Sequence, residues 1–214
     1  MAQVSKYEDL YPFLSAELSN CTNPVMLQAL QRAGREFCQR TEAWWEQLAP
    51  INLVADTVNY RIPSTFDAEI PRIKEVRINT AASIANGDKG SLIDPYYYSF
   101  TPIRRRNELG TILAENTLTL DDSLEPDEAV TSGLEVAVYL VPFLASQGAD
   151  PAFLNKWAEA IVGRALALLL TSPKKPWTNA QQAGVHQFEF IRGVGRARAE
   201  KIKGYKSGGY SMKA

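Results

Sequence analysis

One histidine and two acidic pairs are the residues of this chain that could perform acid–base chemistry. His186 is the only imidazole, and no Ser or Cys stands beside it in a nucleophile motif such as Gly-x-Ser-x-Gly. We expect it on the surface of a helix or at a contact with a partner. Asp121-Asp122 and Asp127-Glu128 supply carboxylates of the kind that glycosidases use. They flank Pro126 in a stretch typical of a turn, which favours plain loop residues over the alternative of a cell-wall hydrolase.

The two cysteines do not have the spacing of a metal site. Cys21 and Cys38 have no second Cys pair and no nearby His to complete a zinc ligand set. Cys38 falls within the apolar pattern of a helix, and we expect a buried free thiol there. The sequence predicts no enzyme, no metal and no cofactor.

The stretch FIRGVGRARAEKI, residues 190–202, has two interpretations. Gly-Val-Gly followed by basic residues resembles a helix-hairpin-helix DNA-binding motif over residues 188–203, in which backbone N–H groups of the turn face a phosphate. The position before the first Gly, often Pro in that motif, is Arg192. A continuous helix is favoured, because apolar and small residues recur at steps of three and four from Phe188 to Ile202. Two helical glycines cost about 1 kcal/mol each, which tertiary packing can offset.

Charge is distributed unevenly along the chain. From Pro173 onward there are nine basic and two acidic residues, a net charge of +7, so the first 172 residues carry −8 of the overall −1. An acidic body with a basic C-terminal arm favours docking of the arm on a negative surface or on an acidic part of a neighbouring copy. A solvated helix face with a loose tail is the alternative.

Aromatic residues stand next to three arginines in the middle of the chain. Tyr97 and Tyr98 belong to PYYYSFTPI, which is followed by Arg104, Arg105 and Arg106. These groups could stack on and pair with a nucleic acid strand. A subunit interface or a channel lining is favoured, because Tyr and Arg are enriched in protein interfaces and this half of the chain is acidic.

The composition is that of a globular protein. The chain has 214 residues, of which 45% are hydrophobic and 22% charged. No apolar run reaches the ~18 residues of a membrane span. The N-terminus has acids where a signal peptide needs a basic start and an apolar run. We expect no membrane association and a protein kept inside a cell, or inside a particle assembled there.

Helical patterns occupy both ends of the chain. A short helix is expected around Glu8 to Ser19, and a second from the capping Asn23-Pro24 to near Trp44-Trp45. A third is expected from Asp150-Pro151 to about Thr171, and a last one is capped by Asn179. GYKSGGYSMKA at the C-terminus has the composition of a flexible tail.

Strand patterns rich in Val, Ile, Thr and Tyr occupy the middle of the chain. They are INLVADTVNYRIP, IKEVRI, TILAENTLTL, with a tight hairpin turn at Glu115-Asn116, and LEVAVYLVPF; NGDKGS is expected to be a loop. The predicted fold is α+β, with a helical bundle of about four helices, an inserted antiparallel β-region and an extended C-terminal tail. Residues 1–45 and 145–204 form the helical domain, 46–144 the β-region and 205–214 the arm.

The order of these features resembles the head-to-tail adaptor (connector) proteins of tailed bacteriophages, particularly those of short-tailed phages. The shared features are a helix ending in the Trp pair of TEAWWEQ, then VNYRIPSTFDAEIPRIKEVRI, GTILAENTLTL, VAVYLVPFLA, IVGRALALLL, Lys175-Pro176-Trp177 and HQFEFIRGVGRARAEKIKG. The resemblance covers about residues 7–204 and lies in order and spacing. The stretch LEPDEAVTSG and the triple Arg have no match in that pattern.

The resemblance implies a structural virion protein at the head–tail junction, assembled in the host cytoplasm. Members of that family form a ring, usually of about twelve copies, under the portal protein. The ring extends the DNA channel for genome ejection, without sequence specificity, and offers a platform to a tail or nozzle protein. The helical domain would form the ring, and the arm, with Tyr205, Lys206, Tyr210 and Lys213, would bind the portal.

Overall fold

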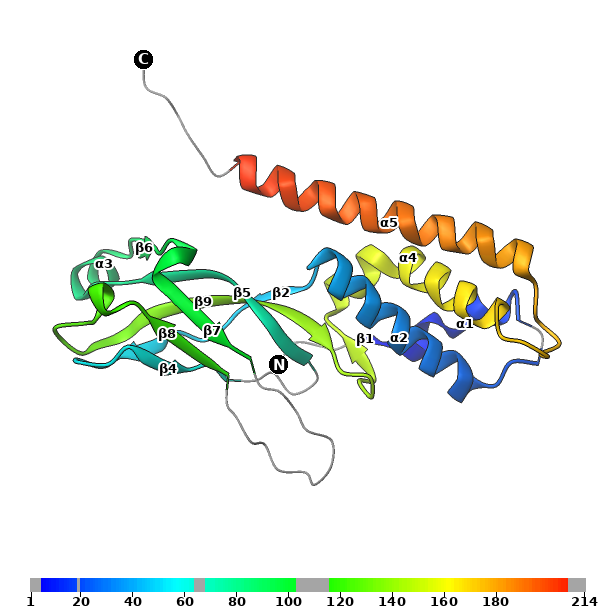
Figure 1. Ribbon diagram of the computed structural model, residues 1–214, viewed down its shortest axis with the longest axis horizontal. Coiled ribbons are helices and arrows are strands. Elements are labelled where there is room, and N and C mark those ends of the chain that lie inside the picture. The colour runs from blue at the N-terminus through cyan, green and yellow to red at the C-terminus, as the bar shows by residue number, and fades with distance from the viewer. Residues whose placement is uncertain (1–4, 19, 64–67, 103–115, 208–214) are drawn as a thin grey trace, which may run out of the picture. The chain divides into compact units, whose positions relative to one another are not determined.

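The computed structural model describes residues 5–18, 20–63, 68–102 and 116–207 (Figure 1). Helix and strand are both present in these residues, which confirms the α+β class. The chain divides into two compact units. The helical unit comprises Met1–Trp44 and Val141–Ala214, and the β-unit comprises Trp45–Leu140.

The described residues of the helical unit form a 3₁₀ turn, four α-helices and a small antiparallel ladder of β1 with β10. Their bounds are β1 Ser5–Lys6, η1 Tyr7–Leu10, α1 Tyr11–Ser15, α2 Asn23–Thr41, β10 Gly148–Ala149, α4 Pro151–Leu170 and α5 Ala180–Ser207. Helix α4 packs against both α2 and α5. The expected first helix is therefore shorter than predicted, because a 3₁₀ turn forms its first part.

Two helix starts predicted from local sequence are confirmed. The Asp150 carboxylate accepts a hydrogen bond from the backbone N–H of Phe153 at 2.9 Å, with Pro151 in the first turn of α4. The Asn179 side chain accepts one from the N–H of Gln182 at 3.1 Å, at the start of α5. Each cap satisfies a backbone donor that the helix itself leaves unpaired.

The predicted bounds of α2 are corrected at both ends. Thr22 occupies the N-cap position with extended backbone, so Asn23 is the first helical residue rather than the cap. The helix ends at Thr41, because Glu42 adopts a left-handed conformation with φ of 54°. Trp44 therefore follows the helix, and its ring stacks on Phe153 with centroids 5.8 Å apart.

An aromatic cluster fills the core between the helices. The ring of Phe37 on α2 lies 5.3 Å from Trp157 and 6.1 Å from Phe153, both on α4, and 6.2 Å from Phe190 on α5. Cys38, next to Phe37, is fully buried and free, as predicted. Burial raises the pKa of its thiol well above the usual range, so the group stays protonated.

The described residues of the β-unit form two sheets. Their elements are β2 Trp45–Gln47, β3 Ile51–Leu53, β4 Asn59–Arg61, β5 Ala68–Ile78, α3 Ala81–Asn86, β6 Ser91–Leu92, η2 Pro95–Tyr97, β7 Tyr98–Thr101, β8 Thr117–Leu120, η3 Asp122–Leu124 and β9 Val130–Pro142. One sheet has the order β2-β9-β5-β6, with β3 also paired to β9, and the other has the order β4-β8-β7. The long strand β9 is buried almost throughout from Leu134 on, as expected of a central strand.

Of two turn predictions for the β-unit, the NGDKGS loop is confirmed at residues 87–90, between α3 and β6. Strand β8 pairs antiparallel with β4 on one edge and β7 on the other, with Thr117 opposite both Arg61 and Thr101. Both edges of β8 are therefore paired with other strands, while the predicted hairpin partner, residues 111–113, and Glu115 of the predicted turn lie outside the described residues. A short helix, α3, precedes the predicted NGDKGS loop, and it ends where Gly87 takes φ of 70°.

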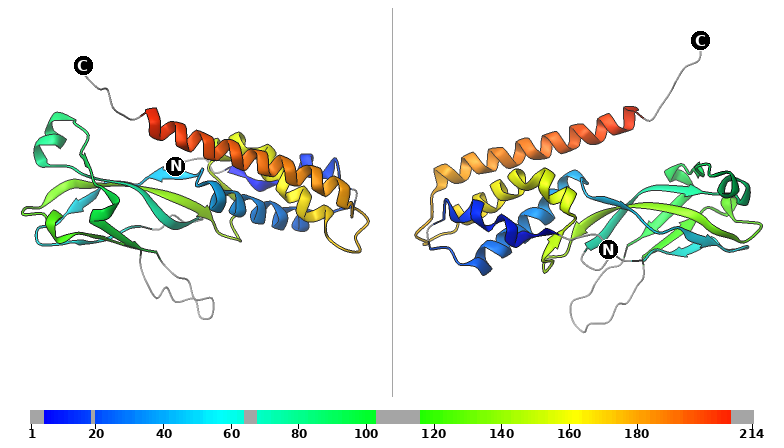
Figure 2. Two further views of the ribbon diagram at one scale, coloured as in Figure 1. Left: turned by 45° about the horizontal axis from the view of Figure 1, so that its top comes forward. Right: turned by 180° about the vertical axis from the view of Figure 1, so that it is seen from behind.

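Helix α5 runs without interruption through Gly193-Val194-Gly195 (Figure 2). This confirms the continuous helix and excludes the helix-hairpin-helix interpretation, which needs a turn at these glycines. The helix continues to Ser207, so residues 205–207, assigned to the extended arm from sequence, are helical. Residues 208–214 lie outside the described part of the chain.

Candidate interaction surface

Two glycines set the close approach of α5 to α4. A Cβ at Gly193 would lie 2.4 Å from the Cβ of Ala160, closer than two such atoms ever approach. A Cβ at Gly163 on α4 would lie 3.2 Å from the carbonyl oxygen of His186. Each helix therefore presents a glycine where the other passes. Gly193 serves packing, and this packing decides which face of α5 points outward.

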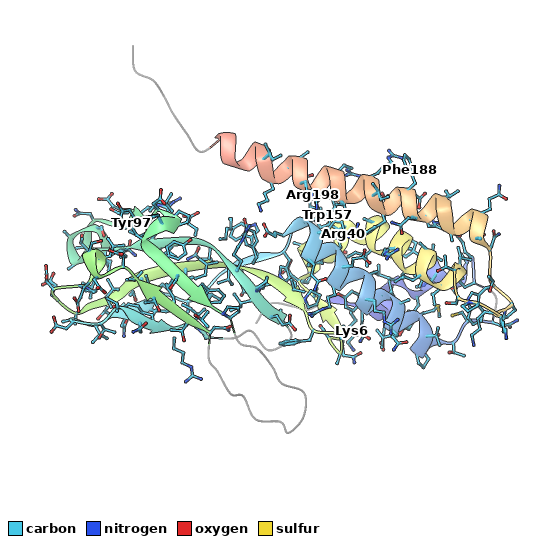
Figure 3. The ribbon with its side chains drawn as sticks, in the orientation of Figure 1. Lys6, Arg40, Tyr97, Trp157, Phe188 and Arg198 are labelled. Carbon is cyan, nitrogen blue, oxygen red and sulfur yellow. The ribbon has the colours of Figure 1, made fainter. Side chains whose placement is uncertain are left out.

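The outward face of α5 carries a row of apolar and small residues, here called the outer stripe: Gly184, Phe188, Ile191, Gly195 and Ile202. At about 100° per residue they fall within an arc of roughly 60°. The exposed fractions of the three large members are 62% for Phe188, 51% for Ile191 and 59% for Ile202. Phe188 projects away from α4 (Figure 3).

The outer stripe is not covered by any described part of the chain. A Cβ at Gly184 or Gly195 would have no atom within 4 Å beyond its own helix backbone and chain neighbours. The outward face of a helix in a monomeric protein is ordinarily polar. A row of exposed large apolar groups marks a surface that another protein covers.

Basic side chains border the outer stripe. Arg192 and Arg196 are exposed on one side of it. On the other side Arg198 is exposed and its Nε donates to the backbone carbonyl of Arg40 at 2.9 Å. Lys201 forms an ion pair with Glu42. The stripe is thus apolar along its centre and positive at its edges.

His186 lies inside the helical unit, which corrects its predicted place on the surface. Its side chain is 10% exposed, with Nε2 2.7 Å from Oε2 of Glu17 and Nδ1 3.1 Å from Oε2 of Glu189. Gln182 also donates to the Glu17 carboxylate, at 2.6 Å. These contacts tie the segment after α1 to α5. His186 therefore contacts its own chain, whereas a surface position or a contact with a partner was expected.

The predicted aromatic site is described only in part. Tyr96 and Tyr97 are exposed, at 86% and 43%, and their rings meet edge to face with centroids 5.5 Å apart. Tyr98 begins β7 and is half-buried. Arg104, Arg105 and Arg106 lie outside the described residues, so their proximity to the tyrosines stays a prediction.

The predicted portal-binding residues lie at or beyond the end of the described residues. Tyr205 and Lys206 belong to the last turn of α5, but their side chains are outside the described part. Tyr210 and Lys213 are outside it entirely. Their role remains a proposal.

The candidate carboxylates lie in a loop, except that Asp122 begins the 3₁₀ helix η3. Asp121 caps η3, where its Oδ1 accepts from the backbone N–H of Ser123 at 3.0 Å. The Ser123 hydroxyl donates to the same oxygen. The hydrogen bond from the hydroxyl, and after it the one from the N–H, lowers the pKa of Asp121, so the carboxylate stays ionised and is unsuited to act as a general acid. Among the described residues, no group of three or more His, Cys, Asp and Glu could hold a metal ion. In the same residues, no helix is long and apolar enough to cross a membrane.

The sequence predicted the periodicity of α5 but not the exposure of the outer stripe. The helix has apolar residues on two faces, and both follow steps of three and four. Only the contact of Gly193 with Ala160 assigns Phe190 to the core and Phe188 to the exterior. The signal in the sequence that could have revealed the stripe was the pair Gly184 and Gly195, two glycines on the same face of the helix.

Six chains among solved structures match this chain, and they include two from the necks of GTA particles. No protein-family model and no curated protein matches the chain. A chain from the neck of an empty GTA particle, computed with C6 symmetry, is 14% identical, with 92% of this chain and 94% of that one covered and a TM-score of 0.33. A chain from the neck of a native GTA particle, computed with C12 symmetry, is 16% identical, with the same coverage and a TM-score of 0.32. At these TM-scores the likeness carries no argument about fold or function, and both matches come from GTA particles, which gives no support to the short-tailed type.

Proposed function

We propose that this protein is a structural component of the neck of a phage-like particle. One observation carries the proposal: α5 presents three large apolar groups, Phe188, Ile191 and Ile202, on a face that no described part of the chain covers. Such a surface suits a protein that works inside an assembly. The order of sequence features, which resembles head-to-tail adaptor proteins, points to the head–tail junction as the assembly.

In the finer form of this proposal, the protein forms a ring, with twelve copies as the expected number, between a portal protein and a tail or nozzle protein. The helical unit supplies the ring contacts, and the residues around Tyr97 and Arg104 to Arg106 supply further subunit contacts or face the channel. Residues 205–214 bind the portal. The DNA passes through without base-specific contacts. The ring assembles on the portal in the host cytoplasm, and the chain alone is largely monomeric.

Two other functions were considered on the sequence. A helix-hairpin-helix DNA-binding role is discarded, because α5 is continuous through the glycines. A hydrolase role has no support in the described carboxylates, since Asp121 serves as a helix cap. A zymogram on cell-wall substrate that stays dark throughout is the expected result.

The test is assembly on the portal. Purified protein, purified portal and their mixture are compared by mass photometry and negative-stain imaging. We expect a monomer alone and a ring of added density on one face of the portal in the mixture. Absence of any ring at saturating protein would refute the proposal. A variant with Phe188→Ser and Ile191→Ser, both exposed, should keep its thermal stability and lose ring formation.

A further inference from the structure

We propose that the outer stripe of α5 receives the exposed Phe13 of a second copy of this chain, in a head-to-tail contact centred on Gly195. This deepens the proposed function and rests on it, because it names the partner of the same surface.

Gly195 is the floor of a hole on the outer stripe. The residues three and four positions away on a helix surround a given position, and for Gly195 these are Ile191, Arg192, Arg198 and Ala199. All four are exposed, and a Cβ at Gly195 would meet nothing within 4 Å. The hole therefore has two apolar sides and, at its edge, Arg192 and Arg198, the second of which donates to the backbone carbonyl of Arg40. It fits one large apolar side chain accompanied by carboxylates.

Phe13 on α1 is such a side chain. It is 60% exposed, and the neighbouring Pro12 and Ala16 are exposed as well. Carboxylates stand one turn to either side, Asp9 before it and Glu17 after it. Asp9 accepts from the backbone N–H of Lys6 at 3.2 Å. Glu17, in contrast, is paired with His186 at 2.7 Å and accepts from Gln182 at 2.6 Å within its own chain. Glu8 and Asp9 therefore supply the net negative charge near Phe13.

The charges of the two surfaces are opposite. Residues 7–17 contain three acidic and no basic residues, whereas residues 190–203 contain five basic residues and one acidic residue. A copy of this chain therefore offers the stripe a partner with matching charge as well as a matching apolar group. A portal or tail protein on the same stripe is the competing occupant.

The contact joins two different surfaces of the helical unit. Helix α5 covers one side of α4, and α1 lies beside α2 and α4 away from the outward face of α5 (Figure 2). A contact between unlike faces leaves each copy with one free face of each kind, so it repeats from copy to copy. This is the kind of contact that a closed ring requires.

Cross-linking of purified full-length protein at high concentration tests the contact without any portal, because covalent trapping detects a contact too weak to hold a stable dimer. The parent chain carries Cys21→Ser, and Cys38 is buried. Ala16→Cys lies beside Phe13, and Ala199→Cys lies beside Gly195, so both contact residues remain. A mixture of the two single-Cys chains, one of them tagged, is treated with a short bismaleimide and analysed by intact mass. We expect the mixed dimer to exceed either homodimer by about tenfold.

Matched variants separate the contact from chance collision. Ala152→Cys, also an exposed alanine, replaces Ala199→Cys as the control and should give no excess of mixed dimer. Gly195→Leu fills the hole and should abolish the cross-link, whereas Gly184→Leu, about 16 Å away along the helix, should not. Both changes favour the helix, so loss of the cross-link in Gly195→Leu cannot come from unfolding of α5. Equal yields with Ala152→Cys, or yields unchanged by Gly195→Leu, would overturn the proposal.

Portal experiments then keep the two proposals apart. If the Ala16–Ala199 cross-link forms but no ring appears on the portal, the head-to-tail contact stands and the neck function fails. If Gly195→Leu still forms a normal ring on the portal, the neck function stands and this contact is wrong.

Discussion

His186 and Glu17 meet at 2.7 Å although 169 residues separate them in the chain. The other ring nitrogen of His186 lies 3.1 Å from Glu189. A neutral imidazole has one N–H and one lone pair, so it can donate to only one of two carboxylates. The imidazolium donates to both. The geometry therefore favours the protonated ring in the folded state.

The first prediction concerns the dependence of stability on pH. Burial lowers the pKa of His186, but hydrogen bonds to Glu189 and Glu17 and their charges raise it by more, so it lies above its ordinary value of 6.5. The stabilisation is fully present below pH 6.5 and is lost as pH rises through the folded-state pKa. His186→Gln should reduce the free energy of unfolding by about 1–3 kcal/mol at low pH. The reduction should shrink as pH rises.

Urea denaturation of both proteins at about pH 5.5 and about pH 9 measures this difference. Groups common to the two proteins, such as the tyrosines and carboxylates, cancel in the comparison. A loss of equal size at both pH values would mean that the folded state does not bind the proton at His186.

Some features of the fold follow from local sequence, and others depend on residues far apart in the chain. Asp150-Pro151 specifies the start of α4 because the cap, the Pro and the first turn are consecutive. The continuity of α5 follows from the spacing of its own apolar residues. No spacing in the sequence brings Glu17 to His186, and nothing in the sequence indicated that they pair. The pairing of β8 with β4 and β7 is non-local in the same way, and a local hairpin was predicted instead.

The outer stripe was likewise predictable from the sequence only in part. The residues of the outer stripe were visible in the sequence as a periodic pattern, but exposure is a property of what the rest of the chain leaves uncovered. The approach of Gly193 to Ala160 settles that question, and it depends on two helices together. The uneven distribution of charge was visible in the sequence alone, and it predicts that the partner surface of α5 is negatively charged.

The second prediction compares two identical changes two residues apart. Gly193→Ala places a methyl group 2.4 Å from the Cβ of Ala160 and should reduce the free energy of unfolding by about 1–2 kcal/mol despite the better helix propensity of Ala. Gly195→Ala meets open space and should increase it by up to about 1 kcal/mol. Thermal and urea unfolding of the two variants give the signs. Destabilisation by both would contradict the assignment of Gly195 to the exposed face.

The third prediction concerns DNA. Arg192 and Arg196 are exposed on a continuous helix, and no turn there offers backbone N–H groups to a phosphate. We expect weak binding to duplex DNA that disappears as salt is raised, with the same affinity for unrelated sequences. Fluorescence anisotropy with two duplexes of different sequence, at low and high salt, measures both properties. A protected footprint at one defined site would contradict the prediction and the neck function with it.

The last prediction concerns the C-terminal residues and rests on the proposed neck function. Because α5 extends to Ser207, the cut that leaves the helix whole removes residues 208–214, with Tyr210 and Lys213. The truncated chain should keep its free energy of unfolding within about 0.5 kcal/mol, since no described contact of the core involves these residues. It should fail to attach to the portal, because aromatic anchors contribute most to such contacts. Tyr205→Ala combined with Tyr210→Ala should cause most of the same loss.

Lysine variants separate anchoring from steering. Lys206→Ala with Lys213→Ala should slow attachment at low salt and leave the dissociation rate nearly unchanged, because exposed charges act mainly on association. The difference from the unaltered chain should vanish at high salt, where charges are screened. Surface plasmon resonance on immobilised portal measures both rates. If the chain that ends at Ser207 still decorates portals at normal occupancy, the arm is not the docking element, and the outward faces of the helical unit must carry the contact.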